Sequence, residues 1–188
     1  MASKDLDGVR VAIILDTDFE QVEMTEPRKA LEEAGATCKL ISPKSEVIGV
    51  KHDEKKDTFK VDLPLDRAQP DEFDAVLLPG GALNADALRV NHAAQEFVRK
   101  IDEAGKPMAI ICHAPWLLVS AGLAKGRHLT SYHTIQDDMI NAGANWEDRE
   151  VIVDRNLVSS RQPSDIPAFN REMIRLFAEA KRGKLRAA

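Results

Sequence analysis

The chain has 188 residues, of which 44% are hydrophobic, and a formal net charge of -5 at pH 7. This length suits one domain over 1–188 with an ordinary core, and without a basic patch with interleaved aromatic residues we expect no nucleic-acid partner. No apolar stretch approaches the roughly 20 residues of a membrane span. The start, Met1 to Asp5, lacks the apolar segment of a signal peptide, so we expect a cytoplasmic protein with no membrane partner.

The first half of the chain predicts strands separated by one helix. Residues 9–15 are apolar except for Arg10 and are rich in β-branched side chains, which is typical of a buried strand. An acidic loop, 16–23, follows, and then a helix with Thr25 as its N-cap and Gly35 after its end. The further strands expected here are 37–41, a hairpin of 47–50 and 58–61 around a charged tip, and 74–78.

The second half alternates helices and strands. Residues 92–104 have an amphipathic helical pattern. Thr134, with Asp137 three residues later, resembles a capping box that opens another helix. The other expected elements are a strand at 108–112, a helix at 114–123, strands at 150–153 and 157–160, and a last helix at 163–180. Apolar strands alternating with amphipathic helices predict a mostly parallel sheet covered on both faces.

Cys112 lies at the corner between the fourth of these core strands and the helix that follows at once. A chain that passes from strand to helix without a spacer must turn sharply, which is the geometry of a nucleophile elbow. The positive end of the helix favours the thiolate, so we expect an activated nucleophile. Cys38 lies inside a strand pattern and is expected in the core.

Two other loops are expected at the same edge of the sheet, because ligands of such folds bind at the carboxyl ends of the strands. Gly80 and Gly81 carry no side chain, so their backbone can approach a ligand closely. The N–H groups of Gly81 and His113 are therefore candidate donors of an oxyanion hole.

The sequence offers several candidates for the acid and the base. Glu20, after the first strand, is a candidate to hydrogen-bond the thiol or to change its pKa. His113 is either a base or only an amide donor, and His128 and His133 are rival bases. Arg161 either borders the pocket or pairs with an acid.

Several motifs resemble the PfpI family of intracellular cysteine proteases, whose relatives include the Parkinson-associated protein deglycases. The matching motifs are Leu78 to Gly81, Cys112-His113 with Pro115, Thr130 to Tyr132, Asp137 to Gly143, Glu150 to Asp154, and Ser159 to Pro163. The resemblance runs from about Val9 to Phe177. It implies a flavodoxin-like three-layer α/β sandwich that assembles as a homo-oligomer, a dimer first and a hexamer as the alternative.

The resemblance also implies roles for single residues. Cys112 corresponds to the nucleophile, His113 to the histidine after it, and Glu20 to the carboxyl hydrogen-bonded to the thiol. Proteolytic members complete a triad with a glutamate that a neighbouring subunit supplies just after the Gly-Gly pair. This chain has no glutamate there, and Asp86 is the nearest acid. Tyr132 corresponds to a tyrosine that borders the pocket, as Gly80 is expected to do.

Three functions stay open. The first is a stress-related thiol hydrolase, without cofactor or metal, acting on peptides or on small carbonyl adducts such as methylglyoxal forms. The second is a redox-sensing protein whose Cys112 is oxidised to sulfenic or sulfinic acid with little turnover. The third is a metal-dependent phosphoryl transferase using Asp16 and Asp18 with Asp137 and Asp138, but the second pair sits in a first helical turn, where acids are favoured anyway.

Overall fold

Residues 5–187 are described by a computed structural model of the chain, with only the backbone described for 184–187. The sequence-based expectation about a signal peptide concerned Met1 to Asp5. Of these residues, Met1 to Lys4 lie outside the described residues. None of the helices within 5–187 is long and apolar enough to cross a membrane.

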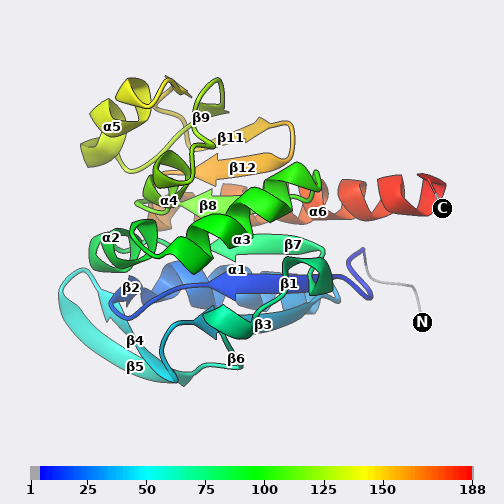
Figure 1. The fold of residues 1–188 in the computed structure, drawn as a ribbon, viewed down its shortest axis with the longest axis horizontal. Helices are drawn as coiled ribbons and strands as arrows, with labels where there is room; N and C mark the ends of the chain where they lie inside the picture. The colour runs from blue at the N-terminus through cyan, green and yellow to red at the C-terminus, as the bar shows by residue number, and fades with distance from the viewer. Residues whose placement is uncertain (1–4, 188) are drawn as a thin grey trace.

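A seven-stranded sheet in the order β11-β12-β8-β7-β1-β3-β6 forms the centre of the structure (Figure 1). All neighbouring strands are parallel except β11 and β12. The five central strands, β3-β1-β7-β8-β12, follow the flavodoxin-like order, which confirms the predicted fold class. The strands are Arg10–Ile14 (β1), Thr37–Ser42 (β3), Leu63–Pro64 (β6), Ala75–Leu78 (β7), Met108–Ile111 (β8), Val151–Asp154 (β11) and Leu157–Ser160 (β12).

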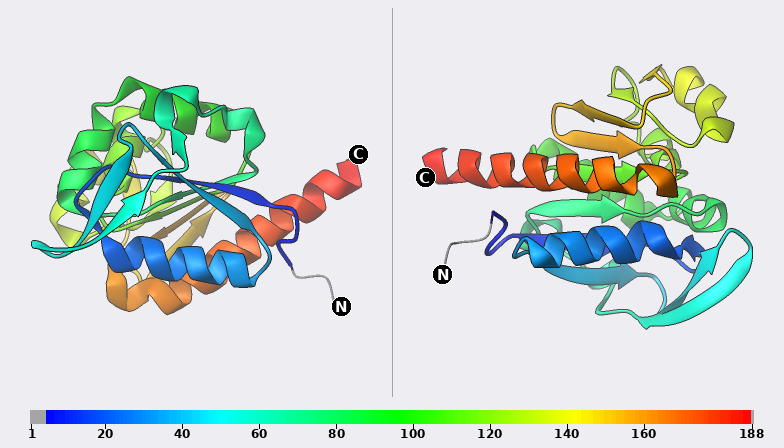
Figure 2. Two further views of the ribbon diagram at one scale, coloured as in Figure 1. Left: turned by 90° about the horizontal axis from the view of Figure 1, so that it is seen from below. Right: turned by 180° about the vertical axis from the view of Figure 1, so that it is seen from behind.

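Helices cover both faces of this sheet, as Figure 2 shows from two sides. One face carries α1 (Gln21–Glu33) and α6 (Ile166–Ala187). The other carries α2 (Ala82–Arg89), α3 (His92–Glu103), α4 (Pro115–Ser120) and α5 (Gln136–Asn141). Alternate residues of β1 point into opposite layers, Val11 with Ile13 into one and Ala12 with Ile14 into the other. A strand buried on both faces is continuously apolar for this reason.

Smaller elements surround the carboxyl edge of the sheet. A hairpin of β4 (Glu46–Lys51) and β5 (Glu54–Lys60) pairs through β4 with the short β2 (Phe19–Glu20). The short strands β9 (His128–Leu129) and β10 (Asn145–Trp146) pair near β11. Single 3-10 turns occupy Leu65–Arg67, Pro70–Glu72, His133–Ile135 and Pro163–Asp165.

The first helix begins four residues before the predicted N-cap. Glu20, the last residue of β2, is the N-cap of α1, so Thr25 lies inside the helix and its hydroxyl donates to the Gln21 carbonyl at 3.1 Å. The earlier start places Glu23 and Leu31 on one buried face, because residues four or eight apart share a side of a helix. Glu23 therefore points into the protein instead of lying in a loop.

Two further expectations differ from the structure. The capping box at Thr134 does not form, because a 3-10 turn precedes α5 and no side chain caps that helix. The helix α2, which was not predicted from the sequence, begins directly after Gly81. Gly81 has φ +94°, and an added Cβ would meet the backbone of Asp18 to Glu20, so glycine is needed at this turn.

We expect Phe169→Ala to lower the free energy of unfolding by about 3–5 kcal/mol, because it leaves a cavity in a close-packed core. Phe169 is fully buried in the layer between α6 and the sheet. Ile140→Ala is the control, since Ile140 is 47% exposed, and we expect a change of less than about 0.5 kcal/mol. Urea unfolding of both variants measures the difference, and equal losses would contradict this packing.

Candidate active site

Cys112 follows the last residue of β8 and has φ +64°, in the left-handed region that side chains other than glycine rarely adopt. Hydrogen bonds on both sides hold this conformation. The Cys112 N–H donates to the Ser160 carbonyl at 3.1 Å, and its carbonyl accepts from the Tyr132 N–H at 2.9 Å. The sharp turn predicted from the sequence is therefore present, with the sulfur at the carboxyl edge of the sheet.

The Cys112 sulfur is surrounded by groups from its own corner, from the Gly80–Gly81 turn and from α1. The Nδ1 atom of His113 lies 3.1 Å from the sulfur. The backbone N–H groups of Gly81 and His113 are directed at the sulfur and favour its anionic form. The pair of amides that the sequence suggested as oxyanion donors is thus brought to the thiol.

A buried carboxyl, that of Glu23, lies beside the thiol. Its Oε2 accepts a hydrogen bond from the Gly80 N–H at 2.9 Å. Among residues 5–187, Oε1 has no partner at ordinary hydrogen-bond geometry, so its contact with Cys112 is looser than an ordinary hydrogen bond. Burial and the nearby Glu20 raise the pKa of Glu23 from 4.5 to about 8. The carboxyl therefore keeps its proton at neutral pH and can act as a donor toward the sulfur.

Gly80 makes this arrangement sterically possible. A Cβ at this position would collide with the Glu23 carboxyl and with the side chain of Cys112. Gly80 thus acts behind the thiol, while its neighbour Gly81 lines the pocket in front of it.

The structure corrects the expectation that the Glu20 carboxyl lies beside the thiol. Its Oε2 accepts from the His52 N–H at 2.9 Å, so the carboxyl binds the hairpin turn. Glu20 still lines the pocket wall, but the carboxyl in contact with the sulfur belongs to Glu23. The difference follows from the early start of α1, which turns Glu23 inward. A helix read from Gln21 would have put Glu23 on the same face as Pro27 and Leu31.

The thiol of Cys112 is 7% exposed. Burial raises its pKa and the Glu23 carboxyl raises it further, against the smaller opposing effect of the Gly81 and His113 amides. The net direction is opposite to the lowering expected from the helix end. Because α4 begins at Pro115 and has six residues, its positive end is weak compared with desolvation.

The ring of His113 is held in a fixed plane. It stacks on Tyr132 with ring centroids 4.9 Å apart and meets the edge of Trp116 at 5.3 Å. Burial and the nearby His133 lower the pKa of His113, so the ring is neutral at pH 7. Its second nitrogen, Nε2, lies 3.3 Å from Thr134 Oγ1. A neutral imidazole in contact with a thiol is a suitable base.

The sulfur opens into a pocket with a volume of about 370 Å³. The turn of the β4–β5 hairpin contributes Val50, His52, Asp53 and Lys55 to its wall. These residues lie about sixty positions before Cys112 in the sequence, and no local pattern marks them, so sequence reasoning missed them. The other lining residues come from segments 18–23 and 81–83, from Cys112 and His113, and from Tyr132 and Pro163.

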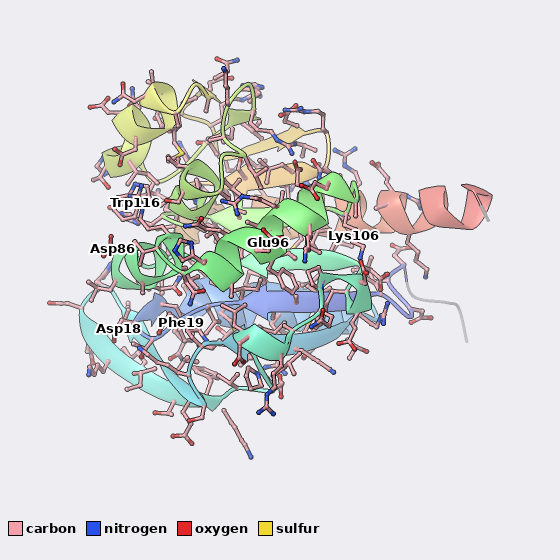
Figure 3. The ribbon with its side chains drawn as sticks, viewed as in Figure 1. Asp18, Phe19, Asp86, Glu96, Lys106 and Trp116 are labelled. Atoms are coloured by element: carbon pink, nitrogen blue, oxygen red, sulfur yellow. The ribbon has the colours of Figure 1, made fainter. Side chains whose placement is uncertain are left out.

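Asp86, the candidate for the family's triad acid, lies on the exposed side of α2 and does not line the pocket of its own chain. Figure 3 shows Asp86 at the same end of the molecule as Asp18 and Trp116. Asp86 therefore has no contact with the site of its own chain, and a role in the site of another copy is the form that its predicted function would have to take. Whether Asp86 has that role stays a prediction.

The remaining candidates have other partners. His128 pairs with Glu147 at 2.9 Å, away from the thiol. Arg161 pairs with Asp165 and Asp148 and does not line the pocket. Of the two roles left open for it, the structure therefore shows the ion pair. Cys38 lies near the amino edge of the sheet, opposite Val11, and burial raises its pKa to about 12.

The acidic pairs of the phosphoryl-transfer hypothesis are also engaged elsewhere. Asp16 forms an ion pair with Lys44 at 2.7 Å. Asp138 accepts a hydrogen bond from the Trp116 indole at 2.7 Å. Within the described residues, these acids do not gather into a group that could hold a metal ion.

Comparison with known proteins places this geometry in a family context. The model of the DJ-1/PfpI family matches residues 9–176. "Deglycase PfpI" of Pyrococcus furiosus is 46% identical over 89% of this chain and 99% of the relative. "Putative cysteine protease YraA" of Bacillus subtilis is 42% identical over 89% and 97%. The crystal structure of Drosophila melanogaster DJ-1beta superposes with a TM-score of 0.80 at 26% identity, covering 94% of this chain and 97% of that one.

We expect Glu23→Gln to flatten the pH dependence of stability. Because the folded pKa of Glu23 is raised to about 8 from 4.5, the unfolded chain releases this proton first. Stability is therefore full below pH 4.5 and is lost as pH rises toward about 8, by up to about 1.4 kcal/mol per pH unit. Unfolding free energies between pH 5 and 8 measure this slope. Glu26→Gln is the matched control, since Glu26 is an exposed glutamate on the same helix, and an equal slope in wild type and Glu23→Gln would refute the buried, protonated carboxyl.

Proposed function

The chain belongs to the DJ-1/PfpI family, and on that premise we propose that it is a cysteine-dependent hydrolase whose nucleophile is Cys112. Relatives named as deglycases and as a cysteine protease support a hydrolase-type enzyme at the level of the family. The observation that carries the proposal is the 3.1 Å contact between the Cys112 sulfur and Nδ1 of a neutral His113. This contact joins a nucleophile to its base.

The raised pKa of Cys112 makes the base necessary. As the sulfur attacks a carbonyl carbon, the thiol proton moves to Nδ1 of His113, so no free thiolate has to exist beforehand. The electron pair of the C=O bond moves to oxygen, where the N–H groups of Gly81 and His113 stabilise it. The imidazolium returns the proton to the leaving amine. Water then hydrolyses the thioester and restores the thiol.

Glu23 contributes a proton that stays in the site. A protonated carboxyl beside the sulfur donates a weak hydrogen bond to developing negative charge and adds no charge of its own. An ionised carboxylate at this position would oppose the attack by raising the pKa of the thiol. The buried state of Glu23 thus favours the reaction up to a pH of about 8.

The pocket suits a small substrate. Its volume of about 370 Å³ lies toward the lower end of the range of small-molecule sites. We therefore propose small carbonyl adducts on thiols or amines, or the end of a short peptide, and a role in stress. The steps above use no cofactor or metal. Two unpaired cysteines suit a reducing, cytoplasmic location.

A homo-oligomer completes the proposal. Asp86 is exposed on α2, Leu83 of the same helix is 68% exposed, and Val90, the C-cap of that helix, is 71% exposed. Apolar side chains on such a face favour contact with another copy, a dimer first and a hexamer as the alternative.

We expect Cys112→Ala to lower kcat/KM by at least about 10³-fold, because the covalent step is lost. Hydrolysis of a peptide substrate and release of methylglyoxal adducts are the two assays. Cys38→Ala is the matched control: it removes the other thiol, which lies in the core, and we expect near-normal turnover. Activity that survives Cys112→Ala would place the chemistry at another site.

A second candidate function is redox sensing at the same sulfur. It is favoured by the absence of a resolving thiol beside Cys112, since Cys38 is buried at the opposite edge of the sheet. Peroxide would convert the thiol to sulfenic acid with loss of water, and a second peroxide would give sulfinic acid. The proton of Glu23 is positioned to hydrogen-bond the oxidised sulfur.

We expect mild peroxide to add two oxygen atoms to Cys112 and to leave Cys38 unchanged, as peptide mass spectrometry would show. In Glu23→Leu the doubly oxidised form should accumulate less, because leucine has no hydrogen-bond donor in place of the protonated carboxyl. An unmodified Cys112 at doses that oxidise free thiols would exclude sensing.

A further inference from the structure

Thr134 lies in the 3-10 turn His133–Ile135, between Tyr132 and α5. The sequence pattern assigns its hydroxyl to a capping box, but no side chain caps α5. The Oγ1 atom lies instead 3.3 Å from Nε2 of His113, at the far side of the ring from the sulfur. The hydroxyl is thus placed at the ring nitrogen that the thiol does not contact.

The role of His113 as a base depends on which nitrogen carries its single proton. A neutral imidazole has one N–H donor and one bare acceptor nitrogen. Only the tautomer with the proton on Nε2 leaves Nδ1 free to take the thiol proton at 3.1 Å. In the other tautomer the ring donates to the sulfur and cannot act as its base.

The stacked rings do not choose between these tautomers. Tyr132 and Trp116 fix the plane of His113 through its faces and edges. Aromatic packing holds the ring position but does not single out one nitrogen. The choice is left to the hydrogen bond at Nε2, and Thr134 is the only residue within 5–187 with a hydrogen bond to that atom.

We propose that Thr134 is a positioning residue: its hydroxyl oxygen accepts a hydrogen bond from Nε2–H of His113 and so keeps Nδ1 bare toward the Cys112 sulfur. The inference rests on the proposed function, because it assigns a third member to the same nucleophile–base pair. That member is neutral and comes from the same chain. Orienting the base therefore needs no acid from a neighbouring subunit.

A hydroxyl differs from a carboxylate in what it does to the base. A carboxylate at Nε2 would stabilise the imidazolium and raise the pKa of the ring, whereas a threonine oxygen fixes the tautomer without adding charge. The titratable groups that face His113 are Cys112, Tyr132 and His133, with Glu23 beyond the sulfur. In the described part of the chain, no carboxylate hydrogen-bonds to the ring, in agreement with its lowered pKa.

The test reads the tautomer directly. Long-range ¹H–¹⁵N spectra of the full chain with labelled histidine, at pH 7.5, distinguish the two protonation sites, and His113→Gln assigns the signals. We expect the Nε2–H form in the wild type and in Thr134→Ser, and a mixture of both forms in Thr134→Val. Valine has nearly the shape of threonine and the position is exposed, so folding is preserved.

Turnover supplies a second readout. We expect Thr134→Val to lower kcat about tenfold with little change in KM, the effect of losing one hydrogen bond, and Thr134→Ser to restore it. If Thr134 had a purely structural role, Thr134→Ser would not restore both kcat and the Nε2–H tautomer.

Two results would overturn the inference: an Nδ1–H ring in the wild type, or an unchanged Nε2–H ring in Thr134→Val. Failure of the proposed function is a different result, activity that persists in Cys112→Ala. The tautomer experiment does not depend on that outcome, since it needs no substrate.

Discussion

The burial of two weak acids side by side, Glu23 and Cys112, sets the protonation state of the whole site. Neither group can ionise cheaply in a place without water, and each makes ionisation of the other harder. At neutral pH both therefore hold their protons. In the proposed mechanism, reactivity then requires a nearby base, and the neighbouring neutral imidazole of His113 meets that requirement. That mechanism moves the thiol proton during the attack and does not start from a standing thiolate.

The fold explains how these groups meet. Strands β1 and β7 are neighbours in the sheet, and the chain leaves them in opposite directions, into α1 on one face and α2 on the other. Ligand sites of such sheets lie at this switch point. Here α1 delivers Glu23 from one side, the Gly80–Gly81 turn delivers an amide from the other, and β8 delivers Cys112 next to them. Helix packing on both faces fixes these positions, as the two separate apolar layers indicate.

Aromatic packing gives the site its rigidity. His113 lies between Tyr132 and Trp116, and the Trp116 indole is itself anchored by Asp138 of α5. The loop between β9 and α5 therefore supports the base, although it lies about twenty residues further along the chain. The hairpin β4–β5 adds a wall with charged and apolar side chains. The pocket wall thus includes a segment separate from those that hold Cys112 and His113.

Much of this protein is determined locally. The apolar strands, the helix patterns and the absence of a spacer after the strand before Cys112 identify a mostly parallel sheet covered on both faces and its elbow, because side-chain periodicity and steric limits act over a few residues. Glycine at 80 and 81 likewise marks a close approach of the backbone. These features were predicted from the residues themselves, and the structure has the mostly parallel sheet and the sharp corner at Cys112. The flavodoxin-like fold was implied by the family resemblance.

The identity of the carboxyl beside the thiol was decided only by tertiary structure. Glu20 and Glu23 are three residues apart in an acidic segment, and which one faces the sulfur depends on where α1 begins and on how it packs. The same holds for Thr134, whose hydroxyl could cap a helix or reach a ring twenty-one positions earlier. Such choices depend on distances across the fold. Sequence patterns carry no such distances, so packing against the sheet determined them.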